Sequence, residues 1–364
     1  ALFLVSETMR FPLLVCLAFA FTSPLSAAEL TIRSTVLIGE APPKETDGWK
    51  AAPGKLQSPF GIDFDGAGNM VIVELEGGRV HRLSPDGQFT TLAGDGSRSY
   101  TGDDGPAAKA TFNGMHNVQV TAAGDIYIAD SWNHVIRKID HTSGKISTVA
   151  GNGKAGFGGD GGPALAASFN YVMCIAMNQQ KSKIYVADLN NRRIRVVDLE
   201  TGIVSTVAGN GKRGVPGDGT LAVDSPLVDP RAVAVDSQDN VYILERGGHA
   251  LRVVRPNGRI HTVAGNGKSG FADGPALQAQ FHAPKHLAVG DGDAVYVADD
   301  RNRAIRKYDP STQTVTTVLG RGIGMPPRYL SRPHGVCFHD GVLYAVDTGH
   351  HRVLRVAMPP QTPR

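Results

Sequence analysis

Short hydrophobic stretches recur along the chain after residue 30, and within each stretch apolar and polar residues alternate. Such alternation predicts β-strands with one buried face. In residues 114–151 it predicts four strands, at roughly 117–121, 125–129, 135–140 and 146–150, separated by the Gly, Asn and Asp residues typical of turns. This stretch has no 3.6-residue helical period.

The four-strand unit occurs six times. Each unit ends on an apolar strand followed by a glycine, and these glycines are 55 to 58 residues apart: Gly39, Gly94, Gly151, Gly209, Gly265 and Gly320. An acidic residue that ends an alternating strand marks the same units: Glu74, Asp130, Asp188, Glu245, Asp299 and Asp347. Four short strands in a repeat of this length predict the blade of a β-propeller. The 44 glycines among 364 residues agree with a fold rich in tight turns.

We therefore predict an all-β, six-bladed β-propeller. Its sixth unit has only three strands before Pro359, and a further strand lies at Thr31–Gly39. We expect this N-terminal strand to complete the last blade, which would close the ring and protect its edges. The blades are expected at about 58–94, 114–151, 171–209, 229–265, 283–320, and 333–358 with 31–39.

Residues 1–28 have the pattern of a secretory signal peptide. The Met9-Arg10 pair precedes an apolar run at 11–21, and small residues at 25–28 form a cleavage site. The native start is expected at Met9, and the protein is expected to be secreted or periplasmic, with no membrane span in the mature chain. The remaining chain is predicted to be one propeller domain, 29–358, and a short tail, 359–364.

Two units carry a recognisable signature. The second reads GDIYIADSWNHVIRKID, and the third reads KIYVADLNNRRIRVVDLETG after GFGGDGGPALAASF. This order of strand, Asp, Asn-His and Ile-Arg resembles the NHL-repeat family of six-bladed propellers, over essentially all of 31–358. The resemblance implies the fold, while for function it allows binding modules, scaffolds and a few enzymes.

Residues that recur in every blade are expected to hold the blades together. An arginine follows each strand-end acid by seven or eight residues, which predicts a repeated, partly buried carboxylate–guanidinium pair. These arginines are Arg82, Arg137, Arg195, Arg252, Arg306 and Arg355. His134, His249 and His351 lie between the landmarks and are expected to be turn or surface residues.

Asp-Gly pairs recur in the loops between blades, at Asp47, Asp104, Asp160, Asp218 and Asp273. We expect the aspartate to cap a short helix that has proline in its first turn. A calcium loop is the alternative, but these loops have fewer oxygen ligands than a calcium hand uses.

One position at the start of each innermost strand differs from blade to blade, and it lies beside the central channel. Its occupants are Phe60, His116, Met173, Arg231, Lys285 and His334, and Asn117 and His286 directly follow two of them. Arginine can hold a carboxylate or phosphate with two hydrogen bonds, and lysine adds a point charge. The channel mouth is thus predicted to bind an anion through His116, Asn117, Arg231, Lys285, His286 and His334, although side chains that are merely solvated remain an alternative.

His334, in RPHGV, resembles the Pro-His-Gly segments of the peptidyl-hydroxyglycine amidating lyase, a six-bladed propeller with metal ligands at this strand start. That resemblance implies zinc or calcium at His116 and His334, with His286 as a further candidate. However, none of the six positions is a carboxylate, and a catalytic zinc takes three protein ligands. Our first expectation is therefore that there is no cofactor.

The formal net charge is only +3, and the basic residues are interspersed with acidic ones, which argues against a nucleic-acid partner. We expect a monomeric, exported, non-catalytic binding or scaffold module for an extracellular protein, a glycan or a small anionic ligand. The rival hypothesis is a metal-dependent lyase or hydrolase at the central channel.

Overall fold

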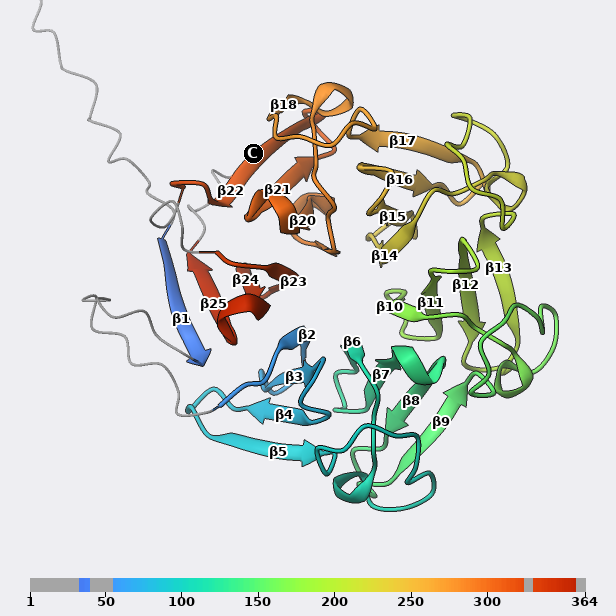
Figure 1. Ribbon diagram of the computed structural model, residues 1–364, viewed down its shortest axis with the longest axis vertical. Helices are drawn as coiled ribbons and strands as arrows, with labels where there is room; N and C mark the ends of the chain where they lie inside the picture. The colour runs from blue at the N-terminus through green and yellow to red at the C-terminus, as the bar shows by residue number, and fades with distance from the viewer. Residues whose placement is uncertain (1–32, 40–54, 324–329, 358–364) are drawn as a thin grey trace, which may run out of the picture. The chain divides into compact units, whose positions relative to one another are not determined.

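The computed structural model describes residues 33–39, 55–323 and 330–357. Six antiparallel sheets are arranged around a central channel, with one strand of each sheet nearest the centre (Figure 1). The prediction of an all-β, six-bladed propeller is confirmed. The predicted signal peptide and the tail at 359–364 lie outside the described residues.

Blades 1 to 3 each contain four strands in chain order from the centre outwards. Blade 1 comprises β2 (Pro59–Phe64), β3 (Met70–Glu74), β4 (Val80–Leu83) and β5 (Phe89–Ala93). Blade 2 comprises β6 (Met115–Val120), β7 (Ile126–Asp130), β8 (Val135–Ile139) and β9 (Ile146–Ala150). Blade 3 comprises β10 (Val172–Met177), β11 (Lys183–Asp188), β12 (Arg193–Asp198) and β13 (Val204–Ala208).

Blades 4 to 6 follow the same plan, except that blade 5 has a short additional strand and blade 6 takes its outermost strand from the N-terminal part of the chain. Blade 4 comprises β14 (Pro230–Val235), β15 (Val241–Glu245), β16 (Ala250–Val254) and β17 (Ile260–Ala264). Blade 5 comprises β19 (His286–Val289), β20 (Val295–Asp299), β21 (Ala304–Asp309) and β22 (Thr314–Gly320), with the short β18 (Gly274–Pro275) outside them. Blade 6 comprises β23 (Pro333–His339), β24 (Val342–Asp347), β25 (Arg352–Ala357) and, outermost, β1 (Arg33–Gly39).

The helical segments are single 3₁₀ turns in the loops. One set follows the second strands: η2 (Ser131–Asn133), η7 (Asp300–Asn302) and η8 (Thr348–His350). Another set lies between blades: η1 (Ala107–Lys109), η3 (Ala164–Ala166), η4 (Ala222–Asp224) and η5 (Ala276–Gln278); η6 (Asp291–Asp293) lies in a hairpin of blade 5. In the described ranges no helix is long and apolar enough to cross a membrane.

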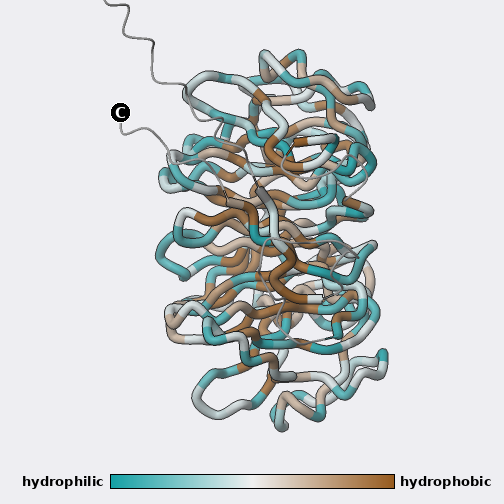
Figure 2. The backbone as a smooth tube through the Cα atoms, turned by 90° about the vertical axis from the view of Figure 1, so that its left-hand side faces the viewer, coloured by the Kyte–Doolittle hydropathy of each residue, from teal (hydrophilic) through white to brown (hydrophobic). Residues whose placement is uncertain are grey.

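The hydrophobic core lies between neighbouring blades. One cluster joins Val71 and Val73 of blade 1 to Val118 and Ile128 of blade 2, all fully or almost fully buried. Because successive side chains of a strand point to opposite faces, each blade presents apolar residues to both of its neighbours. Figure 2 shows the resulting hydrophobic interior between two more hydrophilic faces.

The backbone geometry at the end of each unit explains why this position is always glycine. All six have a positive φ, between +88° and +101°. A Cβ at these positions would lie 2.1–2.5 Å from a backbone carbonyl oxygen at the start of the third strand. The conformation and the close approach both require glycine, which explains why this residue is the clearest landmark in the sequence.

The N-terminal strand β1 pairs antiparallel with β25, so the first described strand lies beside the last. Val36 and Ile38 point into the core and are 2% and 0% exposed. The strand therefore occupies the place where the sequence lacked a fourth strand for the sixth blade.

The strand-end acids share one partner in all six blades. Each carboxylate accepts a hydrogen bond of 2.5–2.9 Å from the backbone N–H three residues before the variable strand-start position. The donors are Gln57, Asn113, Asn170, Val228, His282 and Ser331. The acid thus fixes the point at which the chain enters each innermost strand.

The predicted pairing of these acids with arginine holds in four blades and fails in two. Arg137, Arg195, Arg252 and Arg306 lie 3.6, 3.5, 2.8 and 3.0 Å from their acids. In these blades the spacing is seven residues. In blades 1 and 6 the spacing of eight places Arg82 and Arg355 on the opposite face of the strand, because side chains alternate. There His81 and Arg352 contact the acid instead, at 3.2 and 3.1 Å.

Four of the predicted loop aspartates, Asp104, Asp160, Asp218 and Asp273, do not cap the helical turns as predicted, and Asp47 lies outside the described residues. The turns carry no side-chain cap, and their cap residue is proline or leucine. Asp160 and Asp273 instead bind Arg195 and Arg306 at 2.6 and 2.5 Å. In blade 2 this role belongs to Asp103, the neighbour of the predicted Asp104, which binds Arg137 at 2.6 Å. Each of these guanidinium groups is thus held between a buried and a half-exposed carboxylate.

His134, His249 and His351 are turn residues, as expected. All three have a left-handed backbone, with φ between 48° and 59°. The Nδ1 atom of each ring accepts a hydrogen bond from a backbone N–H that leads into the following blade, at 2.9–3.3 Å. They are therefore additional connections between blades.

We expect removal of β1 to expose an apolar edge on blade 6. A chain that begins at residue 40 should melt at a markedly lower temperature or aggregate, because β25 loses its hydrogen-bonded neighbour. A chain that begins at residue 29 is the control. Thermal unfolding with light scattering provides the measurement, and equal melting temperatures for the two chains would refute the role given to β1.

Removing the buried carboxylate beside Arg195 should lower the free energy of unfolding more than removing the half-exposed one. Asp188→Ala strands a fully buried guanidinium charge and removes the acceptor of the Asn170 N–H, so we expect a loss of about 3 kcal/mol or more. Asp160→Ala should cost only about 1 kcal/mol, since water can reach its position, which is 36% exposed. Denaturant unfolding measures both, and equal losses would contradict this division.

Candidate functional site

The six variable strand-start residues form one layer across the channel, which we call the strand-start ring. In five blades the pairing of the first and second strands shifts register at this residue, as in a β-bulge. A bulge redirects the side chain at the end of a sheet, here towards the channel. Five ring residues are at most 6% exposed, and the side chain of Lys285 is 16% exposed. The members are Phe60, His116, Met173, Arg231, Lys285 and His334.

Phe60 connects three predicted site residues. Its ring centroid lies 4.7 Å from that of His116 and 4.8 Å from that of His334. The guanidinium carbon of Arg231 lies 5.4 Å from the same centroid, a cation–π distance. The structure therefore places two histidines and an arginine around one aromatic side chain.

Arg231 is an incompletely paired buried cation. Its only hydrogen bond runs from Nη1 to the carbonyl oxygen of Met173, at 3.4 Å, and Nε has no partner within the described part of the chain. Every other buried arginine there has a carboxylate within 4 Å: Arg137, Arg195, Arg252, Arg306 and Arg352. Burial, together with the nearby Arg246, lowers the pKa of Arg231 to about 10.

Lys285 lies next to a carboxylate that the sequence analysis missed. Its Nζ is 3.9 Å from Oδ2 of Asp300, which is 3% exposed and also approaches His334 at 3.5 Å. Burial and the charge of Arg231 lower the pKa of Lys285 to about 8. Asp300 directly follows the strand-end acid Asp299, a position where blades 2 and 6 have Ser131 and Thr348. Comparing this position across the blades would have revealed it.

In both ring histidines burial favours the neutral form. Burial and then Arg231 hold the pKa of His116 well below its usual value. Burial also lowers the pKa of His334, against the raising effect of Asp300. No group of three or more His, Cys, Asp or Glu side chains in the described ranges is arranged to hold a metal ion.

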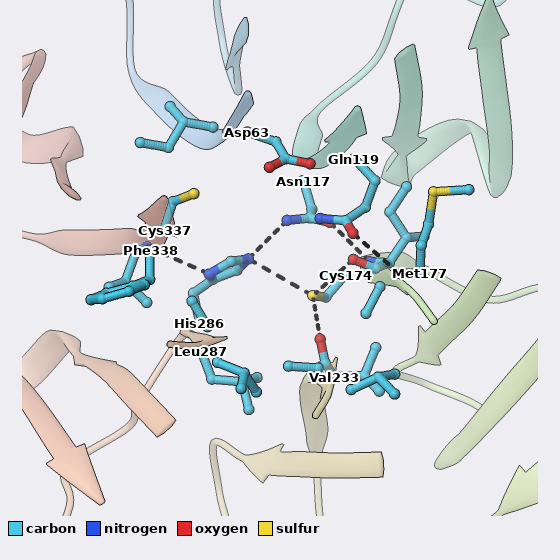
Figure 3. A pocket seen from close by; sticks show the side chains of 18 of the residues that line it. Asp63, Asn117, Gln119, Cys174, Met177, Val233, His286, Leu287, Cys337 and Phe338 are labelled. Carbon is cyan, nitrogen blue, oxygen red and sulfur yellow. Dashed lines mark hydrogen bonds between the residues drawn. The ribbon is translucent and has the colours of Figure 1, made fainter. Parts of the chain in front are cut away.

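Asn117 and His286 form a separate layer, one residue further along the strands. Nδ2 of Asn117 donates to Nε2 of His286 at 2.8 Å, and Sγ of Cys174 lies 3.8 Å from the same nitrogen (Figure 3). The predicted site residues thus occupy two layers rather than one mouth. Burial and Arg231 lower the pKa of His286 to about 4, and burial raises the pKa of the Cys174 thiol to about 11. Cys174 and Cys337 are both buried and free.

The residues of this layer, Asn117, Cys174 and His286, are part of the lining of a cavity of about 170 Å³. Asp63 and Gln119 point into it from blades 1 and 2, and the exposed Gln179 and Lys181 line it as well (Figure 3). Asp63 and Gln119 stand three residues after the ring position. The sequence-based prediction considered only the strand-start position of each innermost strand, and for this reason it did not include the residues three positions later.

The comparisons with known proteins agree with the fold and with the repeat. A family model described as NHL repeat matches residues 330–355. NHL repeat-containing protein 2 of Homo sapiens is 24% identical over 289 residues, which covers 69% of this chain and 40% of that protein. The chain spans well under two thirds of the length of the curated relatives that it matches. The predicted NHL resemblance is confirmed.

Solved structures share the architecture at low identity. An auxiliary nutrient binding protein from Bacteroides ovatus superposes with a TM-score of 0.62 at 16% identity, covering 90% of this chain and 76% of that one. Virginiamycin B lyase from Staphylococcus aureus, solved with quinupristin, gives a TM-score of 0.53 at 14% identity, covering 85% and 83%. At these identities the likeness concerns the fold.

The Asn117–His286 pair predicts an acid-sensitive step in stability. Nε2 of His286 accepts a hydrogen bond and cannot do so when protonated. Its folded pKa of about 4 lies below the unfolded value of ~6.5, so the unfolded chain binds more protons between these pH values. Stability should therefore fall by about 3 kcal/mol as the pH is lowered through this window. Between pH 7 and 4, the free energy of unfolding measured with denaturant should fall less for His286→Gln than for wild type or for the exposed control His141→Gln. Parallel pH curves for all three proteins would contradict the role given to His286.

Proposed function

We propose that this NHL-repeat propeller is a non-catalytic binding module that holds a small anionic ligand at the strand-start ring. The observation that carries the proposal is Arg231, a buried guanidinium with an unpartnered Nε and no carboxylate within 4 Å. Leaving a buried donor unpaired is costly, and a ligand oxygen would remove that cost.

The neighbouring charges support an anion rather than a cation. Burial and the positive charge of Arg231 both lower the pKa of Lys285, since a second buried cation nearby is disfavoured. Arg246 and Arg332, with side chains 36% and 54% exposed, lie on the solvent side of the same region. Asp300 neutralises only part of this charge. A carboxylate or phosphate group would restore the balance, while neutral His116 and His334 could donate or accept hydrogen bonds.

We further propose that the protein is exported and acts as a binding protein. The signal-peptide pattern of residues 1–28 supports export to a periplasm or the cell exterior. The fold similarity to a protein described as an auxiliary nutrient binding protein agrees with a binding role. We propose a monomer whose ligand is a small anion, rather than a glycan or an extracellular protein.

Calorimetric titration with citrate, phosphate and glucuronate tests the proposal and separates carboxylate from phosphate ligands. We expect binding at pH 7.5 that weakens by up to about tenfold at pH 9, because Lys285, with a pKa of about 8, loses its proton. Binding near pH 8 should be accompanied by proton uptake, seen as a dependence of the heat on the ionisation enthalpy of the buffer.

The double variant Arg231→Gln, Lys285→Gln should lose this binding. The double variant Arg82→Gln, Lys183→Gln removes the same charge from exposed positions and should bind like wild type. If none of the three anions binds, or if both double variants lose affinity equally, the ring is not an anion site.

A further inference from the structure

The innermost strand of every blade has one unpaired edge. It lies at the end of its sheet and pairs only with the second strand, so alternate backbone N–H and C=O groups face the channel. Such groups need partners when they are shielded from bulk water.

Side chains from the preceding blade provide these partners on one side of the channel. Oδ2 of Asp63 accepts the N–H of Val120 at 2.7 Å. Oε1 of Gln119 accepts the N–H of Met177 at 3.1 Å. Each accepting side chain lies three residues after the ring residue of its own blade. Each donating N–H lies four residues after the ring residue of the next blade. The protein therefore fills this position of the channel wall with its own carboxylate and carboxamide groups.

On the other side the acceptors are missing. The positions equivalent to Asp63 and Gln119 are Ala176, Ala234 and Ala288 in blades 3 to 5. The N–H groups left facing them belong to Val235, Val289 and Phe338.

The strand register shows that these three N–H groups point into the channel. In blades 4 and 5 the next residue along donates its N–H to the second strand, from Asp236 to Asn240 and from Gly290 to Ala294. Val235 and Val289 must then face the opposite way, because N–H directions alternate along an antiparallel pair. In blade 6 the Val336 N–H points towards His286 in the channel, and Phe338 lies two residues further in the same phase.

The missing side chains and the cavity coincide. Ala176, Ala234 and Ala288 line the cavity of about 170 Å³, together with the residues that carry the three N–H groups. This space is large enough for several water molecules or for one compound of a few heavy atoms. Figure 3 shows Gln119 and Asn117 extending into the channel from blade 2.

The charges at this cavity favour an uncharged guest. The carboxyl of Asp63 lines the cavity and faces the channel, and a second negative charge placed beside a carboxylate is disfavoured. The lysine that lines the cavity, Lys181, is exposed and lowers the pKa of Asp63 by its charge. A carboxamide offers an acceptor for an N–H and a donor for the adjacent C=O, as Gln119 does within the chain.

The geometry points to a second binding site in this cavity, separate from the strand-start ring, for a small uncharged ligand that carries a carboxamide group. The carbonyl oxygen of the ligand accepts from the N–H groups of Val235, Val289 or Phe338, and its N–H donates to the channel-facing carbonyl groups. The guest replaces the side chain that Ala176, Ala234 and Ala288 lack.

Amide-resolved NMR with acetamide as the probe tests this site. The N–H signals of Val235, Val289 and Phe338 should shift saturably, while those of Val120 and Met177, already bonded to side chains, should hardly move. Acetate, which has the same shape but a negative charge, should bind at least several-fold more weakly. N-methylacetamide distinguishes a primary amide from the amide of an acylated amine or a peptide.

Two substitutions of equal size provide the matched variants. Ala234→Gln supplies the missing acceptor and should abolish acetamide binding while slowing hydrogen exchange of the Val289 N–H by more than tenfold. Ala234→Leu fills the same space without an acceptor and should abolish binding without that protection. The ring variant Arg231→Gln, Lys285→Gln should bind acetamide like wild type, which separates this site from the anion site.

Three results would overturn the inference. The three N–H groups could fail to respond to acetamide at its highest usable concentration, which would leave water as the sole occupant. Acetate could bind as well as acetamide, which would refute the ligand class. The Val289 N–H could already be as protected in wild type as in Ala234→Gln, which would show that it has a partner.

Discussion

The hydrogen bond from a backbone N–H to the acid at the end of the second strand is the constraint on which the rest of the propeller depends. It occurs in all six blades at 2.5–2.9 Å, with an acid that is 0–2% exposed. A charge-assisted bond in a dry environment is stronger and more directional than a neutral one. It therefore holds the incoming chain at a fixed distance from the sheet, and the innermost strand can begin only at one residue.

This constraint separates the framework from the channel. Since the acid acts on the backbone three residues before the strand-start position, the side chain at that position does not contribute to the bond. Phenylalanine, methionine, histidine, arginine and lysine all occupy it on nearly the same backbone. The side chain three residues after the strand-start position can also vary. Asp63 and Gln119 accept a hydrogen bond from a backbone N–H of the next blade, whereas Ala234 has no group that could accept one. The channel can thus be asymmetric in chemistry although the blades are nearly identical in shape.

The sequence predicted what alternation and repetition encode. The six blades follow from strand patterns and from glycines whose positive φ tolerates no other residue well. The ring residues Arg231 and Lys285 were found because they stand at a repeated register. The predicted acid–arginine pairs of blades 1 and 6 were wrong. Arg82 and Arg355 follow their acids by eight residues rather than seven, and this one extra residue places them on the other face of the strand.

The candidate site was only partly predictable for a related reason. His286 and Asn117 were grouped with the ring, yet one residue along a strand is enough to move a side chain to another layer of the channel. Asp300 belongs to a 3₁₀ turn after a different strand; a comparison of the blades would have marked its position as variable, but its contact with Lys285 is seen only in the folded chain. The main partner of each strand-end acid is a backbone N–H, which every residue except proline has, so no side-chain pattern could reveal it.

The pairing of β1 with β25 has a consequence for the order of events during synthesis. Within the propeller, a ribosome produces β1 before its partner β25, with more than 300 residues between them. Blades 1 to 5 consist of neighbours in sequence and can form as they emerge, whereas β1 must wait, unpaired, until β25 has been made. Contacts between such distant residues carry a large loop-closure cost and form slowly. The last blade to assemble is therefore the one that contains β1, and until β25 is made the unpaired edges of β1 are open to a chaperone or to a second copy of the chain.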